Sequence, residues 1–258
     1  MRSSSIRSRL RLGQAARIAF MYYPTAMMPA YAAKAGYDAV CIDAEHNTWE
    51  RREIGRMVAL HRLAGIDCMA RTGSRNPTEL YRLLEDGVTA LLIPLVNTSH
   101  EAAVLAQAVK FPPLGQRGMD GAGMDNDYYV NGTAGYASAA NAETMLIVQI
   151  ETPEAVANVD QIAGTKGLDG LFIGPGDLAL RLGCAPDWSE PRMQEAQVKV
   201  AAAAAKHGIA WGRPAGSAAD ISGLAKMGGR LIAYGSDFSA VKAMMLSTYS
   251  QTLAEGLR

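Results

Sequence analysis

Two carboxylates that end neighbouring apolar runs are the side chains of this sequence best suited to hold a metal ion. Glu151 follows the run Met145–Ile150, and Asp177 comes shortly after the run Asp169–Ile173. If both runs are adjacent parallel strands, their tips lie about 5 Å apart, and two like charges at that distance favour a cation between them. Mg²⁺ and Mn²⁺ are commonly held by one or two carboxylates, with water and substrate oxygens in the remaining positions. Spacing alone leaves open the alternative that each carboxylate caps the helix that follows it.

A second group of polar residues follows two earlier apolar runs. Asp43 and His46 stand three residues apart in the string DAEHNTWE, just after the run Ala39–Asp43. At that spacing the carboxylate can orient the imidazole of a general base. Arg71 ends the run Asp67–Arg71 and would place a permanent positive charge where an enolate oxygen or a carboxylate forms. A histidine in a surface loop and a structural salt bridge are the alternatives.

The alternation of apolar runs with longer amphipathic segments predicts how these residues are positioned. The eight expected strands are Arg17–Met21, Ala39–Asp43, Asp67–Arg71, Ala90–Pro94, Met145–Ile150, Asp169–Ile173, Ile209–Arg213 and Leu231–Tyr234. The expected helices include Pro77–Glu85, Ser99–Val109, Pro153–Ile162, Arg192–Lys206 and Phe238–Leu253. This order predicts a single-domain α/β fold over residues 1–258, a (β/α)8 TIM barrel with its chemistry at the carboxyl ends of the strands. A doubly wound sheet is the main rival, but no G-x-G-x-x-G opens a helix after the first strand.

Two segments interrupt or precede this order. Residues 1–14, MRSSSIRSRLRLGQ, are basic but lack the apolar stretch of a secretory signal, so they form a frayed terminus or a first helix. The stretch Phe111–Thr144 is the longest break in the strand–helix order. Compact domains rarely carry such a connection without a use for it, so we expect a loop–helix insertion near the active site.

Composition excludes several classes of partner. The chain has 25 basic and 25 acidic residues, which gives neither the positive field of a nucleic-acid-binding protein nor a polybasic membrane patch. No run of about 18 apolar residues exists to span a bilayer. The three cysteines, Cys41, Cys68 and Cys184, show no C-x-x-C spacing, so we expect no disulfide framework and no structural zinc site. A reducing, cytoplasmic location fits this pattern best.

Taken together, these strings resemble the HpcH/HpaI family of class II pyruvate aldolases. The matching strings are IDAEH at Ile42–His46, AR at Ala70–Arg71, IPLVNT at Ile93–Thr98, FPPLGQRG at Phe111–Gly118, VQIET at Val148–Thr152 and LFIGPGDLALRLG at Leu171–Gly183. They occur in family order over most of the chain. The resemblance implies reversible aldol cleavage of 4-hydroxy-2-oxo acids to pyruvate, or hydroxypyruvate, and an aldehyde through a metal-stabilised enolate.

Carried over by position, the resemblance assigns roles to the residues expected at the carboxyl ends of the strands. Glu151 and Asp177 become the ligands of a Mg²⁺, Mn²⁺ or Co²⁺ ion. Asp43 and His46 become an acid–base dyad, and Arg71 stabilises the enolate. The resemblance also implies a substrate-binding set made of Phe20, Arg71, Gln149, Gly174, Pro175, Gly176, Asp177, Ser217 and Ala218.

Three departures from the family pattern concern specificity. Glu85 stands where the family commonly has aspartate, and we expect it to act beside the catalytic dyad. Phe20 replaces a frequent tryptophan, and Ser217–Ala218 occupy positions often filled by larger aliphatic residues. We therefore expect a roomier site for the aldehyde.

The resemblance further implies a homohexamer, a trimer of dimers in which the helix Phe238–Leu253 is exchanged between subunits. A Schiff-base aldolase is the mechanistic rival, but every lysine falls in a helix or a helix-to-strand loop. Two other functions stay open: a related barrel lyase acting on a CoA thioester or a C–P bond, and a non-catalytic barrel that binds a 2-oxo acid.

Overall fold

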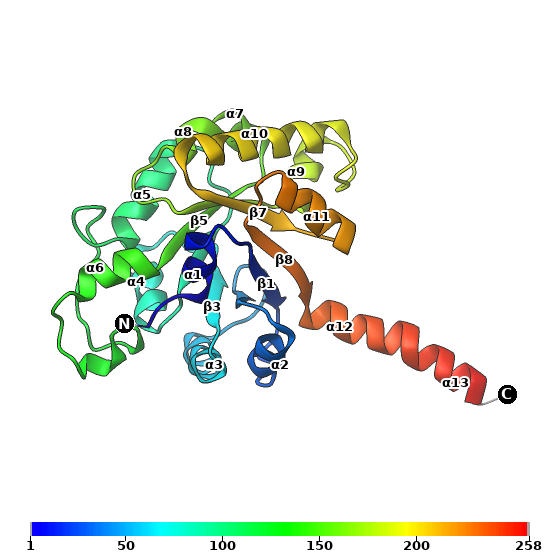
Figure 1. The fold of residues 1–258 in the computed structure, drawn as a ribbon, viewed down its shortest axis with the longest axis horizontal. Coiled ribbons are helices and arrows are strands. Elements are labelled where there is room, and N and C mark those ends of the chain that lie inside the picture. Colours follow the sequence, from blue (N-terminus) through cyan, green and yellow to red (C-terminus); the bar gives the residue numbers. More distant parts are fainter. Residues whose placement is uncertain (1, 257–258) are drawn as a thin grey trace.

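Eight parallel strands close into a barrel in the computed structural model of the protein, which describes residues 2–256 (Figure 1). The strands are β1 (Ala16–Met21), β2 (Ala39–Asp43), β3 (Asp67–Arg71), β4 (Ala90–Ile93), β5 (Met145–Ile150), β6 (Gly170–Ile173), β7 (Ala210–Pro214) and β8 (Leu231–Ser236). Each strand pairs with the next in the chain, and β8 pairs with β1. The predicted (β/α)8 barrel is confirmed, and no strand end differs from its expected position by more than two residues.

Helices form the layer outside the strands (Figure 1). They are α2 (Met28–Ala35), α3 (Arg51–Ala64), α4 (Pro77–Glu85), α5 (Ser99–Val109), α6 (Tyr136–Glu143), α7 (Pro153–Ala157), α8 (Val159–Ala163), α9 (Pro175–Leu182), α10 (Pro191–His207) and α11 (Ala218–Lys226). The expected single helix Pro153–Ile162 is divided into α7 and α8 at Asn158. The Asn158 amide donates to the carbonyl oxygen of Asn97 at 2.9 Å, which ties the break to the loop after β4.

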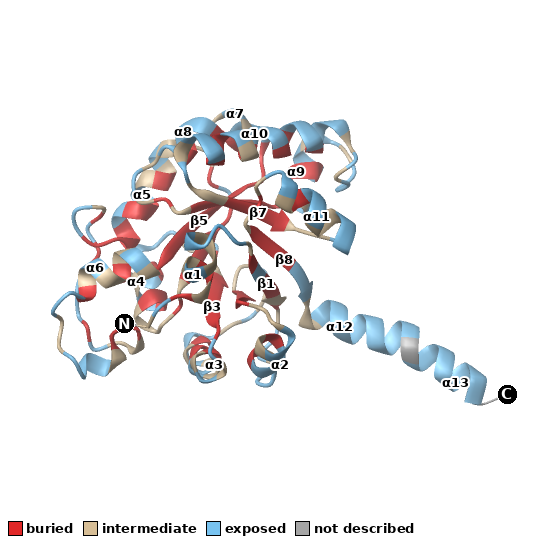
Figure 2. Cartoon of the chain, in the orientation of Figure 1, coloured by how far each residue is buried: buried red, intermediate tan, exposed pale blue. Residues whose placement is uncertain are grey.

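Apolar side chains fill both the inside of the barrel and the layer between strands and helices, so the strands are buried on both faces (Figure 2). Cys41 lies in the inner cluster and Cys68 in the outer one. Burial raises the pKa of the Cys41 thiol to about 12, which keeps it protonated. Both cysteines are therefore packed as small hydrophobic residues.

The opening segment forms a helix, α1 (Ser5–Arg11), that closes the amino end of the barrel. Its Ile6 side chain is fully buried. Ser4 caps the helix by accepting from the Arg7 N–H, and its hydroxyl donates to Asp67 Oδ2 at 2.6 Å. Of the two alternatives for this segment, the helix is correct, because the cap and one apolar residue fix it to the barrel floor.

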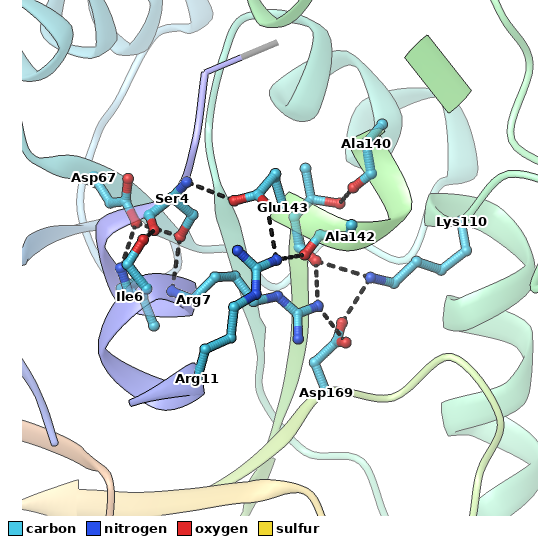
Figure 3. A network of polar contacts seen from close by, with 12 residues as sticks. Ser4, Ile6, Arg7, Arg11, Asp67, Lys110, Ala140, Ala142, Glu143 and Asp169 are labelled. Carbon is cyan, nitrogen blue, oxygen red and sulfur yellow. Dashed lines mark hydrogen bonds and ion pairs between the residues drawn. The ribbon is translucent and has the colours of Figure 1, made fainter. Parts of the chain in front are cut away.

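A polar network joins α1 to the far side of the floor (Figure 3). The Asp169 carboxylate pairs with Arg7 at 2.5 Å and with Lys110 at 2.7 Å. Both cations also donate to the carbonyl oxygen of Thr144. Lys110 is fully buried at this amino end of the barrel. A lysine that forms an imine with the substrate would have to lie at the opposite end, where the strands have their carboxyl ends.

The long connection between α5 and β5 contains the 3₁₀ segment η1 (Met124–Tyr129) and α6. It joins a helix to the strand that follows, so it lies at the amino end of the barrel. Its own buried cluster holds it there: Arg117 donates to Asp125 at 3.0 Å, and the Tyr136 hydroxyl donates to the same carboxylate at 2.5 Å. The expectation that this insertion lies near the active site of its own barrel is wrong.

The last described residues, 237–256, form a helical rod that projects away from the barrel (Figure 1). It comprises α12 (Asp237–Ala243), the π-helical turn η2 (Met244–Tyr249) and α13 (Ser250–Gly256). No side chain of α12 or α13 is buried in the described part of the chain. Within residues 2–256, no helix is long and apolar enough to cross a bilayer.

Candidate active site

A cavity of about 320 Å³ opens at the carboxyl ends of the strands. Its walls come from β1, β3, β5, β6, β7 and β8 and from the segments that follow them. The lining residues are Phe20, Tyr22, Arg71, Gln149, Phe172, Gly174, Pro175, Pro214, Ala215, Ala233, Tyr234, Gly235, Ser236 and Ser239. Polar residues from several strands therefore share one mouth, as the fold requires.

Glu151 directly follows β5, is buried, and lies against Gln149 and Gly174, two residues that line the cavity. Its Oε1 accepts the Leu95 N–H at 2.7 Å, and its Oε2 accepts from the Gln149 amide at 2.7 Å. Burial raises the pKa of the Glu151 carboxyl; the Leu95 N–H opposes this, and the negative charges of Asp177 and Glu45 add to it. The carboxylate therefore stands among like charges, which a bound cation would offset.

The loop after β4 is shaped to present that N–H. Leu95 adopts a left-handed backbone conformation, with φ of 54°, which is unfavourable for a residue with a side chain. Arg75 stabilises it by donating to the carbonyl oxygens of Pro94 and Leu95, at 2.9 and 2.8 Å. The strained turn and its arginine clamp together hold Glu151 in position.

Gly174 gives the Glu151 carboxylate the space it occupies. A Cβ on Gly174 would overlap Glu151 Oε2 and approach the Gln149 amide nitrogen to 2.8 Å. The second atom of that amide, Gln149 Oε1, is buried without a hydrogen-bond partner. A carboxylate seated on a glycine beside an unpartnered acceptor fits a site that receives a cation or its bound water.

Asp177 lies in the first turn of α9 with its side chain 43% exposed, and it forms an ion pair with Arg181 one turn later. Among the described residues, no three His, Cys, Asp or Glu side chains converge on one point. A metal here would thus take two protein carboxylates, and Asp177 would have to release Arg181. This donor set suits Mg²⁺ or Mn²⁺, which keep several water or substrate ligands.

The helix-capping alternative does not describe Glu151. The cap of α7 is Thr152, whose hydroxyl accepts from the Ala155 N–H at 2.9 Å. The cap position of α9 is Gly174, and Asp177 makes no side-chain cap. Neither carboxylate therefore serves as a helix cap.

Asp43 is buried and forms a two-pronged ion pair with Arg71. Its oxygens accept from Arg71 Nε at 2.9 Å and from Arg71 Nη2 at 2.8 Å. Burial alone would raise the pKa of Asp43, but the hydrogen bonds and charge of Arg71 hold it below its usual value. Asp43 also accepts the backbone N–H of Glu45 at 3.3 Å and the Asn47 amide at 3.1 Å. Its carboxylate thus positions the arginine and the loop after β2.

The His46 ring does not form the predicted pair with Asp43. Its Nε2 lies 3.5 Å from Glu45 Oε2, and 59% of the side chain is exposed. The same Glu45 oxygen lies 3.4 Å from Arg71 Nε. Glu45 is therefore a site residue to which the sequence assigned no role, although it stands in the same DAEH string. Side chains on an irregular loop have no fixed direction relative to one another. Sequence spacing therefore could not decide whether Asp43 or Glu45 faces the His46 ring.

Three other expected site residues lie away from the cavity. Glu85 ends α4 at the opposite end of the barrel, beside the 110–144 connection, so its expected place next to the dyad is wrong for this chain. Ser217 caps α11 by accepting from the Asp220 N–H at 3.1 Å, and neither it nor Ala218 lines the mouth. The residues facing the cavity from this loop are Pro214 and Ala215.

An aromatic wall, formed by Phe20, Tyr22 and Phe238, borders the mouth on the β1 side. The Arg71 guanidinium lies 5.6 Å from the Phe20 ring centre. The centre of the Tyr22 ring lies 6.4 Å from the centre of the Phe20 ring and 6.3 Å from the centre of the Phe238 ring, which it meets edge to face. Phe20 and Tyr22 both line the cavity, but the sequence gives no signal for Tyr22 beyond its place at the end of a strand.

The chain is similar to known proteins over most of its length. Residues 18–243 match the family described as HpcH/HpaI aldolase/citrate lyase. The chain is 33% identical over 241 residues to the hydroxypyruvate/pyruvate aldolase of Sagittula stellata, covering 92% of this chain and 93% of that one. It is 35% identical over 211 residues to the 5-keto-4-deoxy-D-glucarate aldolase of Salmonella paratyphi C, covering 81% of each. A solved HpcH/HpaI aldolase/citrate lyase family protein from Burkholderia cenocepacia superimposes with a TM-score of 0.86 at 30% identity, covering 99% of this chain and all of that one.

Proposed function

The chain belongs to the HpcH/HpaI aldolase/citrate lyase family, and we propose that it reversibly cleaves 4-hydroxy-2-oxo acids to pyruvate, or hydroxypyruvate, and an aldehyde. Two of its relatives are named hydroxypyruvate/pyruvate aldolase and 5-keto-4-deoxy-D-glucarate aldolase, which supports the reaction class. The observation that carries the proposal is the nearness of two groups at the carboxyl ends of the strands. The Glu151 carboxylate is buried and its pKa responds to the charge of Arg71, and the Arg71 guanidinium lines the cavity.

The metal in this proposal is Mg²⁺, Mn²⁺ or Co²⁺, with Glu151 and Asp177 as its protein ligands. Such an ion supplies Lewis acidity toward the 2-oxo group of the substrate. Leu95 and Gln149 fix the Glu151 carboxylate for this role through their hydrogen bonds at 2.7 Å. The protein's contribution is thus a rigid carboxylate with space reserved by Gly174.

The amino end of α9 receives the substrate carboxylate in this proposal. Pro175 has no N–H, so the free donors of the first turn are the backbone amides of Gly176 and Asp177. A Cβ at Gly176 would meet nothing within 4 Å, so the backbone there is open to close approach. The helix dipole favours an anion at this end.

Charge and proton movements are assigned to Arg71 and His46. As the C3–C4 bond breaks, its electron pair forms an enolate whose oxygen Arg71 stabilises. His46 accepts the proton of the 4-hydroxyl group, and C4 becomes the aldehyde carbon. Asp43 acts through Arg71, and Glu45 is the carboxylate that faces the imidazole.

A panel assay tests the proposal. The chelated protein is incubated with 4-hydroxy-2-oxo acids, with and without Mg²⁺, Mn²⁺ or Co²⁺, and pyruvate release is measured. We expect release only with metal, and we expect Glu151→Gln to lose the metal-stimulated release. Full activity after exhaustive chelation, with borohydride trapping of substrate on a lysine, would replace this mechanism by an imine one.

The proposed assembly is a homohexamer, a trimer of dimers with the C-terminal rod exchanged between subunits. Two features support it. The rod exposes Val241, Met245 and Leu253, each more than half exposed. A cavity of about 770 Å³, with mostly apolar walls, lies between α2 and α12 and offers a surface for such a helix. Light scattering on a chain truncated before Ser236 tests it, and an unchanged hexamer would refute exchange.

A further inference from the structure

The mouth cavity has two unlike halves. The half beside β5 and β6 contains Gln149 and Gly174, next to the Glu151 carboxylate. The half beside β7, β8 and β1 is lined by Phe20, Tyr22, Pro214, Ala215, Ala233, Tyr234, Gly235, Ser236 and Ser239. None of these residues on the second half carries a charge. Since the 2-oxo acid is assigned to the first half, the second is where the aldehyde part of the substrate lies.

Among the described residues that line the cavity, Arg71 is the one that carries a charge, and two carboxylates already lie against it. Two of its nitrogens donate to Asp43, and Glu45 lies 3.4 Å from Nε. An aldehyde with its own carboxylate or phosphate would therefore find two nearby negative charges and no unpaired cation among the described lining residues. Burying an unpaired charge is strongly unfavourable.

The aromatic wall is held rigidly. The Tyr22 N–H donates to both oxygens of Asp237, at 3.0 and 3.1 Å, and the Tyr22 carbonyl accepts from the Trp49 indole at 3.0 Å. Its ring is half-buried between Phe20 and Phe238. A fixed aromatic surface binds flat or alkyl groups with little loss of side-chain entropy.

We propose that this half of the cavity selects an uncharged aldehyde whose aromatic or alkyl group packs against Phe20 and Tyr22. The inference rests on the proposed aldolase function and names its aldehyde class. Phe20 and Tyr22 touch the substituent and take no part in the bond changes, so they determine specificity alone.

The test compares two acceptors in condensation with pyruvate: benzaldehyde, which is uncharged, and succinic semialdehyde, which carries a carboxylate. For the wild-type protein we expect kcat/KM to be about tenfold higher with benzaldehyde, which is near the upper end of the effect that one aromatic contact supplies. Tyr22→Ala lowers kcat/KM for benzaldehyde about tenfold and leaves succinic semialdehyde nearly unchanged, while Tyr22→Phe keeps the preference. Tyr22→Arg, which adds a cation, shifts the preference toward succinic semialdehyde.

Two controls distinguish a failure of this inference about the aldehyde from a failure of the proposed aldolase function. Tyr23→Ala changes a neighbouring tyrosine that is 60% exposed and outside the cavity, and should leave both acceptors unaffected. Exchange of the pyruvate methyl protons with deuterated water, followed by NMR without any aldehyde, reports the 2-oxo acid half alone and should survive Tyr22→Ala. Equal or better use of succinic semialdehyde by the wild type, with exchange intact, overturns the inference and leaves the aldolase function standing. Absence of exchange in the metal-loaded wild type overturns both.

Discussion

Replacing Gly174 by alanine tests the geometry of the site at a single atom. The backbone there has φ of −89° and ψ of 97°, which alanine adopts freely, so any effect comes from the added methyl group. That methyl would overlap Glu151 Oε2 and stand 3.1 Å from Glu151 Cβ, where ordinary contacts begin near 3.4 Å. The carboxylate must therefore move by about 1 Å.

A displacement of that size has a calculable cost. Misplacing a catalytic group by about 1 Å lowers the rate by about 100-fold, which corresponds to about 2.7 kcal/mol. We expect Gly174→Ala to lower Mn²⁺ affinity by about 10- to 100-fold and kcat/KM for pyruvate release by about 100-fold. The free energy of unfolding should fall by no more than about 3 kcal/mol, the cost of one overpacked methyl group.

Isothermal titration calorimetry with Mn²⁺ and a pyruvate-release assay measure these effects. Gly223→Ala is the matched control, because a Cβ on this α11 residue meets nothing within 4 Å. It should keep wild-type affinity and gain up to about 1 kcal/mol of stability. Wild-type Mn²⁺ affinity in a folded Gly174→Ala protein would refute the claim that Gly174 makes room for a metal ligand.

Three further predictions concern other groups. Asp43→Asn leaves the Arg71 guanidinium without its two-pronged partner and should lower the free energy of unfolding by about 1–3 kcal/mol in urea titrations; because the native pKa of Asp43 is depressed, its stabilisation is present at neutral pH and is lost as the pH falls through that value. Arg75→Ala frees the strained turn at Leu95 and should weaken Mn²⁺ binding about tenfold in calorimetry with the fold intact, whereas unchanged affinity would show that the turn holds itself. His61 is buried with its pKa lowered to about 4 from the usual 6.5, so the neutral ring stabilises the native state above pH 6.5; about 3 kcal/mol should be lost between pH 6.5 and 4 in the wild type, and a His61→Gln variant with the same pH dependence would contradict this.

The barrel could be predicted because its signals are local. Buried parallel strands appear as short apolar runs such as Ala39–Asp43 and Met145–Ile150, and both have these bounds in the structure. The rule that chemistry lies at the carboxyl ends of the strands predicts that Glu151 and Arg71 lie near each other, and in the structure the charge of Arg71 acts on the Glu151 carboxyl.

The remaining features depend on side-chain directions that spacing does not determine. The two-pronged geometry of Arg71 matches Asp43, so the His46 ring stands beside Glu45 instead. Glu85 is the last residue of α4, and a helix that leads into a strand ends at the amino end of the barrel, away from the cavity. The expected strand–helix order was enough to place Glu85 there. The same reasoning places the connection between α5 and β5 at the amino end of the barrel. In contrast, nothing in the sequence signals the contact of Tyr22 with the first turn of α12.

A crystal of the protein soaked with Mn²⁺ and pyruvate, with diffraction recorded at the manganese absorption edge, tests the central claim most directly. The account predicts an anomalous peak bound by oxygens of both Glu151 and Asp177, with Asp177 turned away from Arg181 and pyruvate completing the ligand set. A peak bound elsewhere, or none at saturating Mn²⁺ with pyruvate in the cavity, would contradict it.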